Sequence, residues 1–381
     1  RYPVLQNLKT GRIETLKTNP YATGEPLFPV AAFNSPGYVI TAACAFRPMR
    51  TAKTLPLFSY GALGWHRGEF HSTVVCVDKE PRQDLRRMPR QKVVAGIKRM
   101  RRQLPQNRLR EHLEKCALEY GCPAGKNFFL GRYEAPLPTA RRCNARCLGC
   151  LSEQKGTAIP HCQDRIRFTP SPEEISEVAL AHISRVSKAV VSFGQGCEGD
   201  PLLAADAIEP AIGLIRSATG KGTINLNTNG SLPEVLERLF EAGLDSVRIS
   251  LNSVRPGCYT AYFRPQPYRF DDVLQSIDVA LRKGKHVAIN YLNCPGVTDS
   301  PEEHEALLGF LRHHPIHMIQ WRNLNFDPLL YYYRMNRAAP MGKAIGVKNM
   351  IRKIEKEFPA VMHGYFNPPK EKFGEKWKSA N

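Results

Sequence analysis

The chain has 381 residues, 42% of them hydrophobic, which is enough for one large domain with a substantial core and a smaller domain. Its formal charge is +19, and no stretch reaches the ~18 apolar residues of a membrane span. The first residues, RYPVLQNLKTGR, contain neither the apolar segment of a signal peptide nor an initiating Met. The 11 cysteines of such a chain do not indicate a secreted disulfide framework, so we expect a soluble, cytoplasmic protein with no membrane partner.

The first third of the chain is strongly basic. Residues 1–135 carry 23 Lys and Arg against 10 Asp and Glu, and the densest run is 81–116. Residues 1–75 are rich in Pro, Gly and short β-branched runs, which predicts a few strands or irregular structure, and residues 91–120 have the pattern of one or two basic helices. Such a charge run can attract a polyanion, and RNA is a candidate partner. A solvated helical face is the alternative, because few aromatic residues interleave with the arginines.

From about residue 133, strand-like and helix-like segments alternate. The expected strands are 133–139, 188–194, 222–230, 245–253, 286–296 and 317–325. Amphipathic segments with Gly stops lie between them, so the strands should pair in parallel and form a barrel-like sheet. In such sheets functional residues gather at the carboxyl ends of the strands. The predicted fold class is therefore α/β, with a partial (β/α)6 TIM-like barrel.

The same pattern predicts three parts of the chain. Residues 131–328 form the barrel, and residues 1–130 form a basic N-terminal α+β extension that contributes to substrate binding or to a second metal cluster. Residues 329–381 form a C-terminal helix and a loosely docked basic tail, from which His363 or Tyr365 could reach the site.

Three cysteines follow the first expected strand in the segment RCNARCLGC (142–150). A structural zinc site usually takes four ligands as two pairs, and here a second CxxC pair is missing, although His161 and Cys162 could be recruited. A [4Fe–4S] cluster held by three cysteines leaves one iron open to another ligand. At the functional end of a parallel sheet, the x3 and x2 spacing favours such a cluster, with the ligands Cys143, Cys147 and Cys150.

At these residues the chain resembles the radical SAM superfamily, whose signature is CxxxCxxC after the first strand of a partial (β/α)6 barrel. The resemblance runs from about 133 to 326 and includes three more strand ends. GQGCEGDPLL (194–203) is similar to the family's GGEP stretch, and NTNG and RISLNS end the third and fourth strands. The resemblance implies that S-adenosylmethionine contacts the matching positions, namely Gly199, Asp200, Pro201, Asn227, Ser250 and Asn252.

The resemblance also implies an enzyme. The open iron would bind the amino and carboxylate groups of S-adenosylmethionine, and an electron from the reduced cluster would release a 5′-deoxyadenosyl radical that takes hydrogen from a substrate. A reductase such as flavodoxin or ferredoxin would be a partner. The substrate stays open between RNA and a peptide or small metabolite, and a non-catalytic iron–sulfur or zinc protein is a third alternative.

Two positions depart from the family pattern. The residue before the third cysteine is usually aromatic and helps to cover adenine, but here it is Gly149, so the packing would come from Leu151 or from GVT (296–298). The family's Glu is Asp200 in this chain, while Glu198 lies two residues earlier. We expect Asp200 to meet the ammonium of the methionine moiety.

Cysteines outside the triplet suggest a second site. Four isolated ones are expected to be small buried hydrophobic residues: Cys44, Cys76, Cys258 and Cys294. Three others flank the triplet and are candidate ligands of a second iron–sulfur cluster: Cys116, Cys122 and Cys162. Cys197 is a more speculative fourth ligand, and ordinary core thiols are the alternative.

The last expected strand ends in a polar cluster, QWRNLNFDP (320–328). Strand alternation places Gln320 and Arg322 on one face and, on the other, Trp321, Asn323 and Asn325. Unpaired polar groups at the end of a barrel strand are costly, which favours ligand contact and makes Arg322 a candidate cofactor ligand. A capping network that holds the final loop is the alternative.

Overall fold

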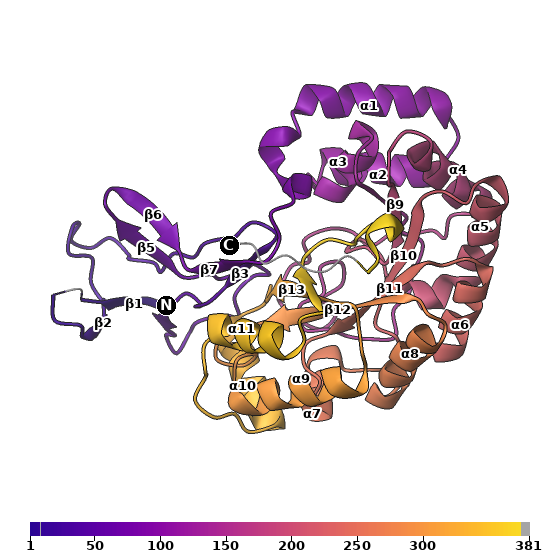
Figure 1. Cartoon of the computed structure of the whole chain (residues 1–381). Helices are drawn as coiled ribbons and strands as arrows, with labels where there is room; N and C mark the ends of the chain where they lie inside the picture. Colours follow the sequence, from indigo (N-terminus) through magenta and orange to yellow (C-terminus); the bar gives the residue numbers. More distant parts are fainter. Residues whose placement is uncertain (8, 375–381) are drawn as a thin grey trace.

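The computed structural model describes residues 1–7 and 9–374 (Figure 1). Its largest sheet has seven parallel strands in the order β14-β13-β12-β11-β10-β9-β8 and is curled into a half-barrel. The strands are β8 (Glu134–Pro136), β9 (Val190–Phe193), β10 (Thr223–Thr228), β11 (Ser246–Leu251), β12 (His286–Asn293), β13 (Met318–Asn323) and β14 (Met362–Gly364). Six of them lie in the predicted segments, so the predicted half-barrel is confirmed. Strand β14 is an addition that the sequence did not predict.

Helices connect successive strands and cover the outer face of the sheet (Figure 1). They are α4 (Pro172–Ile183), α5 (Ala205–Ala218), α6 (Pro233–Ala242), α7 (Pro256–Phe263), α8 (Phe270–Arg282), α9 (Pro301–His313), α10 (Pro328–Ala338) and α11 (Val347–Glu357). Many begin with Pro, which fits the first helical turn because its missing N–H has no partner there. Among the described residues, no helix is both long and apolar enough to cross a membrane.

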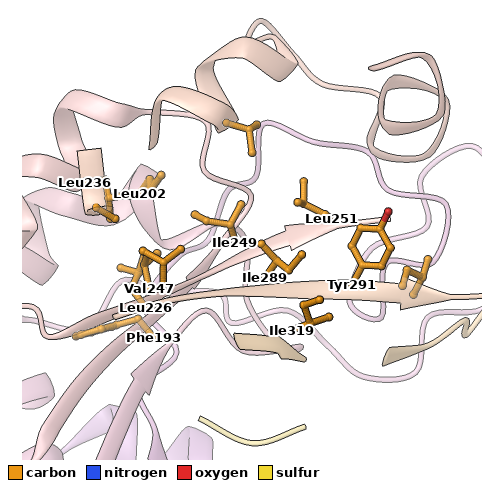
Figure 2. Packing of buried hydrophobic residues seen from close by; sticks show 14 of the residues in the cluster. Phe193, Leu202, Leu226, Leu236, Val247, Ile249, Leu251, Ile289, Tyr291 and Ile319 are labelled. Carbon is orange, nitrogen blue, oxygen red and sulfur yellow. The ribbon is translucent and has the colours of Figure 1, made fainter. Parts of the chain in front are cut away.

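The two faces of the sheet differ in chemistry because successive side chains of a strand point to opposite sides. The outer face is apolar and packs against the helices, as Figure 2 shows for Phe193, Leu226, Val247, Ile249, Ile289 and Ile319. Burial of each such side chain contributes about 1.5–3 kcal/mol. The inner face is polar. The register of neighbouring strands brings these side chains together on it: Glu134, Ser192, Asn225, Asn227, Arg248, Ser250, Asn290, Gln320 and Arg322. The apolar face fixes the fold, and the polar face is available for chemistry.

The C-terminal segment is docked more firmly than predicted. Strand β14 extends the sheet beside β13, and the His363 ring accepts a hydrogen bond from the Trp321 indole at 3.0 Å. The buried Asn367 side chain donates to Glu134 at 2.8 Å and accepts from Gln320 at 3.0 Å. The expectation of a loosely docked tail is therefore wrong up to residue 370, because a polar inner face needs polar partners. The end of the tail, 375–381, lies outside the described residues.

The N-terminal part contains short strands and then helices, as predicted. The strands are β1 (Tyr2–Gln6), β2 (Ile13–Thr15), β3 (Tyr38–Ile40), β4 (Phe46–Arg47), β5 (Leu63–His66), β6 (Glu69–Ser72) and β7 (Val74–Cys76). The helices are α1 (Arg90–Gln103), α2 (Arg108–Leu118) and α3 (Pro123–Leu130). Figure 1 shows the strands beside the β13 end of the half-barrel and the helices beside β8 and β9.

Part of the basic run is used inside the protein. Arg101 and Arg110 both pair with Glu114, which joins α1 to α2, and Arg108 pairs with Glu174 of α4 at 2.7 Å. These ion pairs hold the helical segment together and against the barrel, so they reduce the charge that is available to a polyanion. An RNA partner stays a prediction.

We predict that Asn367→Ala destabilises the protein by about 2–4 kcal/mol, because the change leaves several buried polar groups of the inner face without their partner. The free energy of unfolding from urea denaturation measures the effect. Asn349→Ala is the control, since this exposed side chain bonds only the Ile345 carbonyl and should cost less than about 0.5 kcal/mol. Equal effects of the two substitutions would show that the hydrogen bonds of Asn367 to the inner face do not stabilise the protein.

Candidate metal centre at the carboxyl ends of the strands

Residues 142–150, here called the cysteine loop, are held by the backbone of α7. The Arg146 amide donates to the Phe263 carbonyl at 2.8 Å, and the Leu148 amide donates to the Tyr262 carbonyl at 3.1 Å. Because both bonds involve main-chain atoms, they fix the path of the loop whatever its side chains are. The loop therefore lies at the end of the barrel where the strands finish.

The segment after β9 grips the loop from the other side. The Gly199 amide donates to the Ala140 carbonyl at 2.7 Å, and the Asp200 amide donates to the Arg142 carbonyl at 2.9 Å. A Cβ atom on residue 199 would overlap the Arg142 carbonyl group, which is backbone and cannot rotate away. Only glycine fits at this position, so the similarity of 194–203 to a glycine-rich motif has a steric cause.

The end of β10 makes a third connection. The Asn229 amide side chain donates to Asn144 of the loop at 2.8 Å, and Asn144 donates to Ser231 at 2.8 Å. Asp200 links this strand end to the previous one, because its carboxylate accepts from the Thr228 hydroxyl and from the Asn229 amide, both at 2.7 Å. The ends of β9 and β10 and the cysteine loop thus form one hydrogen-bonded unit.

Gly149 makes the fourth connection, and its neighbours explain why no ring occupies the position. Asn325 donates to the Gly149 carbonyl at 2.9 Å. A Cβ on residue 149 would lie 2.5 Å from Asn325 Oδ1 and 2.9 Å from the Tyr262 hydroxyl. The aromatic group beside the loop is thus Tyr262, whereas the expected Leu151 is partly exposed and Thr298 bonds within its own turn.

The three loop thiols face one another closely enough for their charges to interact. Burial raises the pKa of Cys143 to about 12 and also raises that of Cys147. Three cysteines on one loop are the ligand number of a [4Fe–4S] cluster that keeps one iron open to another ligand. The donor set therefore fits a [4Fe–4S] cluster.

The two acidic residues of the motif are already occupied by the protein's own donors. Glu198 accepts four backbone N–H groups at 2.7–2.8 Å, from Thr139, Ala140, Gly194 and Gln195. Asp200 accepts two backbone N–H groups, from Asn229 and from Leu202 at 3.1 Å, and the Thr228 hydroxyl, and burial raises its pKa to about 6. Glu198 has no acceptor site left, whereas Asp200 keeps one. Contact of Asp200 with an ammonium group stays a prediction.

The other predicted contact residues lie in different places. Pro201 opens the short 3-10 helix η3 (Pro201–Ala204), and the Asn227 side chain donates to the Phe193 carbonyl at 2.8 Å. Ser250 lies on the inner face, in register with Asn290. Asn252 is buried between α7 and α10, where it donates to the Cys258 carbonyl and the Tyr331 hydroxyl. Contact of Asn252 with S-adenosylmethionine stays a prediction, and its buried Oδ1 accepts no hydrogen bond from the described residues.

Some polar residues at the end of β13 form a capping network, whereas others face the interior of the barrel, where a ligand could bind. Asn323 accepts from the Ile40 amide at 3.0 Å and donates to the Tyr38 carbonyl at 2.8 Å, so it holds β3 of the N-terminal part. Asp327 accepts from the Leu55 amide at 3.1 Å. These residues cap the barrel, whereas Gln320 and Arg322 face its interior.

Two arginines meet on the inner face, and only Arg322 was predicted. Arg322 donates to Asn290 at 2.7 Å, and its guanidinium lies 3.5 Å from the centre of the Tyr365 ring. Arg248 donates to Gln320 at 2.8 Å, and its Nε is buried without a partner. Burial and the charge of Arg322 lower the pKa of Arg248 to about 9. The alternation of β11 could have revealed Arg248, since it lies two residues before Ser250.

A second group of donors lies beside the motif after β9. His112, Cys116 and Cys197 have their ligand atoms within 4.8 Å of one another, and Cys122 follows α2 directly. Of the second-site candidates, Cys116 and Cys197 come together, while Cys162 is exposed and lies outside this group. His112 was missed, although its position four residues before Cys116 on a helix is a recognisable signal.

Comparison with known proteins shows which family the chain resembles. The sequence model of the Radical SAM superfamily matches residues 137–308. A GTP 3',8-cyclase of Heliobacterium modesticaldum is 34% identical over 160 residues, which cover 42% of this chain and 45% of that protein. A mitochondrial GTP 3',8-cyclase of Arabidopsis thaliana is 27% identical over 226 residues, which cover 58% of this chain and 51% of that protein. The chain therefore spans about half the length of these curated relatives.

A third relative and one solved structure complete the comparison. Molybdenum cofactor biosynthesis protein 1 of Dictyostelium discoideum is 32% identical over 164 residues, which cover 42% of this chain and 24% of that protein. The crystal structure of HydG, a maturase of the [FeFe]-hydrogenase, aligns with a TM-score of 0.45 and 17% identity over 75% of this chain and 69% of that one.

We predict that Gly199→Ala impairs cluster retention, because the new methyl group must displace either the cysteine loop or the strand end. Overpacking of this kind costs about 1–3 kcal/mol, which corresponds to cluster binding that is weaker by about 5- to 150-fold. Iron per chain after anaerobic reconstitution measures it. Gly213→Ala, with nothing within 4 Å of the new Cβ, should retain iron normally, and full retention by Gly199→Ala would refute the steric argument.

Proposed function

Because the chain belongs to the radical SAM superfamily, and is therefore an enzyme that uses a [4Fe–4S] cluster and S-adenosylmethionine, we propose that it acts on a small anionic substrate held against the inner face of the half-barrel. We further propose that this substrate is a purine nucleotide such as GTP. The observation that carries the proposal is the pair of inward-facing arginines, Arg248 and Arg322, on a face whose polar side chains are neutral apart from Glu134.

The chain's own residues supply the cofactor site at the strand ends. Cys143, Cys147 and Cys150 would hold the cluster, and the backbone around Gly199 and Asp200 would line the side on which S-adenosylmethionine binds. Bound together, these cofactors supply hydrogen-atom abstraction by a carbon-centred radical. The protein's part is to hold the substrate in reach and keep water away from the reacting atoms.

The charge balance of the inner face favours an anion. The inner face carries the two guanidinium groups and the carboxylate of Glu134. Burial and the charge of Arg322 lower the pKa of Arg248, so its charged form is destabilised. A bound phosphate or carboxylate would relieve that repulsion and form charge-assisted hydrogen bonds with the planar guanidinium groups. Asn290, Gln320 and Asn367 add amide groups suited to a heterocyclic base.

The names of the relatives agree with this substrate class. Two of them are named for a reaction of GTP, and their similarity covers 42% and 58% of this chain. Since the chain spans only about half of their length, the transfer of their activity is part of the proposal. A nucleotide is the substrate class in the relatives' names, and its phosphates could bind the two arginines.

RNA is a second candidate, and one observation favours it. Helix α1 exposes six basic side chains, of which Arg101 pairs with Glu114 and the other five are Arg90, Lys92, Lys98, Arg99 and Arg102. A polyanion bound there would show affinity that falls steeply with salt. The helix lies outside the barrel, however, so it supports binding of RNA more directly than chemistry on it (Figure 1).

The reaction class is tested under anaerobic conditions with reduced, reconstituted protein and S-adenosylmethionine. We expect formation of 5′-deoxyadenosine that rises when GTP is added and rises less with ATP or an RNA oligonucleotide. Cys147→Ala removes a cluster ligand and should lower formation by more than about 100-fold, whereas Cys44→Ser should leave it unchanged. Stimulation by RNA alone would favour the second candidate, and no product from the intact protein would refute the proposed chemistry.

The role of the inner face is tested by Arg248→Gln, which keeps a hydrogen-bonding group and removes the charge. Loss of a charged hydrogen bond costs about 1.5–3 kcal/mol, so GTP should bind about 10–100-fold more weakly. Binding is measured by isothermal titration calorimetry. Arg312→Gln, which breaks only an exposed pair with Glu357, is the matched control and should change affinity less than fivefold, a cost of about 1 kcal/mol at most. Unchanged affinity in Arg248→Gln would rule out this arginine as the anion site.

A further inference from the structure

The structure assigns to this chain a second metal site, a single zinc ion held by His112, Cys116 and Cys197, for which Cys122 is a candidate fourth donor. The site lies between helix α2 and the loop that follows β9, and it is independent of the proposed nucleotide chemistry.

Three of the donors converge although two come from distant parts of the sequence. The ligand atoms of His112, Cys116 and Cys197 lie within 4.8 Å of one another. Among residues 1–7 and 9–374, these three side chains are the group of His, Cys, Asp or Glu that comes close enough to share a metal ion. Both cysteines are buried, with exposed fractions of 2% and 5%. Buried thiols and an imidazole that meet in this way form the donor set that zinc prefers.

The spacing suits one ion better than a cluster. Zinc bonds of about 2.3 Å to sulfur and 2.0–2.1 Å to nitrogen, at tetrahedral angles, place the two donor atoms about 3.5 Å apart. His112 Nε2 and Cys116 Sγ are separated by 3.5 Å. A cluster of four irons would put each thiol on a different iron and spread the sulfur atoms more widely.

The donors are held in place before any ion binds. His112 and Cys116 are four residues apart on α2, so they share one face of the helix, and the His112 ring meets the Phe168 ring edge-on at 6.4 Å. On the other side, the Cys197 carbonyl accepts from the Ile166 amide at 2.8 Å. The next residue, Glu198, is fixed by four backbone amides. Such support by outer contacts is what a metal site needs.

Cys122 is the available fourth ligand. Its amide donates to the Cys116 carbonyl at 2.9 Å, so the chain turns back toward the site immediately after α2. Its thiol does not belong to the group of ligand atoms that lie within 4.8 Å of one another, so the side chain would turn toward the ion when zinc binds. A Cys3His set closes a tetrahedral structural site and leaves no open position for a substrate.

The ion would connect the N-terminal helices to the segment that supports the cysteine loop. Helix α2 belongs to the N-terminal helices, whereas Cys197 belongs to 194–203, the segment that grips the cysteine loop through Gly199. Zinc has no redox chemistry, so it would hold this joint unchanged while the iron–sulfur cluster is reduced. The site therefore has a structural role, and its loss would loosen the segment that positions the cofactors.

The first test uses the intact protein purified anaerobically. Elemental analysis should find about one zinc per chain in addition to the iron. The second test uses the full chain carrying Cys143→Ala, Cys147→Ala and Cys150→Ala, which removes the first cluster. Zinc should remain in that variant, and Co²⁺ exchanged into it should give the intense visible bands of a tetrahedral thiolate site. Because neither test requires radical chemistry, failure of the proposed function would not affect them.

Substitutions then assign the ligands in the same triple-variant background. His112→Ala with Cys197→Ser should weaken Co²⁺ binding by more than about 100-fold, since loss of ligands must cost at least as much as loss of an outer contact. His112→Cys keeps a donor and should retain the ion with stronger thiolate charge-transfer absorption, which shows that binding and folding are separable. Cys162→Ser, a nearby exposed cysteine, is the control and should bind normally.

Three results would overturn the assignment. They are absence of zinc from both the intact protein and the triple variant, iron with sulfide at this position in the triple variant, and a Cys116–Cys197 disulfide revealed by intact mass after alkylation. Co²⁺ binding that survives His112→Ala with Cys197→Ser would equally refute the ligand set.

Discussion

The close contact between the backbone at Gly199 and the carbonyl of Arg142 is the constraint on which the rest of the site depends. It brings the end of β9 against the cysteine loop, and there is no room for a side chain between them. Asp200 then carries the connection to the end of β10, and α7 and Asn325 hold the loop from the other side. Three thiols are thus fixed by main-chain contacts from several strand ends. Their geometry is set before a cluster binds, which lowers the cost of ordering them.

The contrast between the two faces of the sheet explains the rest of the architecture. The apolar outer face can be covered by helices alone, but the polar inner face needs hydrogen-bonding partners wherever a ligand does not provide them. Asn367 and Tyr365 from the C-terminal segment meet that need at one end of the face. Arg248 retains a buried nitrogen without a partner. The protein therefore satisfies most of this face itself and leaves its positive charge unbalanced, which is the condition for binding an anionic substrate.

The sequence predicted the features that depend on local patterns. Strand alternation and glycine stops located six of the barrel strands, and the cysteine spacing located the candidate cluster. It did not predict β14 or the docking of Asn367, because a three-residue edge strand has no pattern of its own and its partners lie far away in the sequence. His112 and Arg248 did carry local signals, the spacing to Cys116 and the alternation of β11, but their significance became clear only beside Cys197 and Arg322. The absence of a ring at Gly149 was noticed, but its cause, the approach of Asn325 and Tyr262, could be seen only in three dimensions.

The two cysteine sites differ in a way that would sort metals within one chain. The cysteine loop offers three thiols, which suits a cluster with an open iron. Near α2 the donors lie within 4.8 Å of one another and include an imidazole, which suits one ion. The sites are linked through residues 197–200, where Cys197 faces one and Gly199 supports the other. A change in the tight site would therefore be transmitted to the cysteine loop by a few bonds of rigid backbone, so the N-terminal helices are part of the active structure.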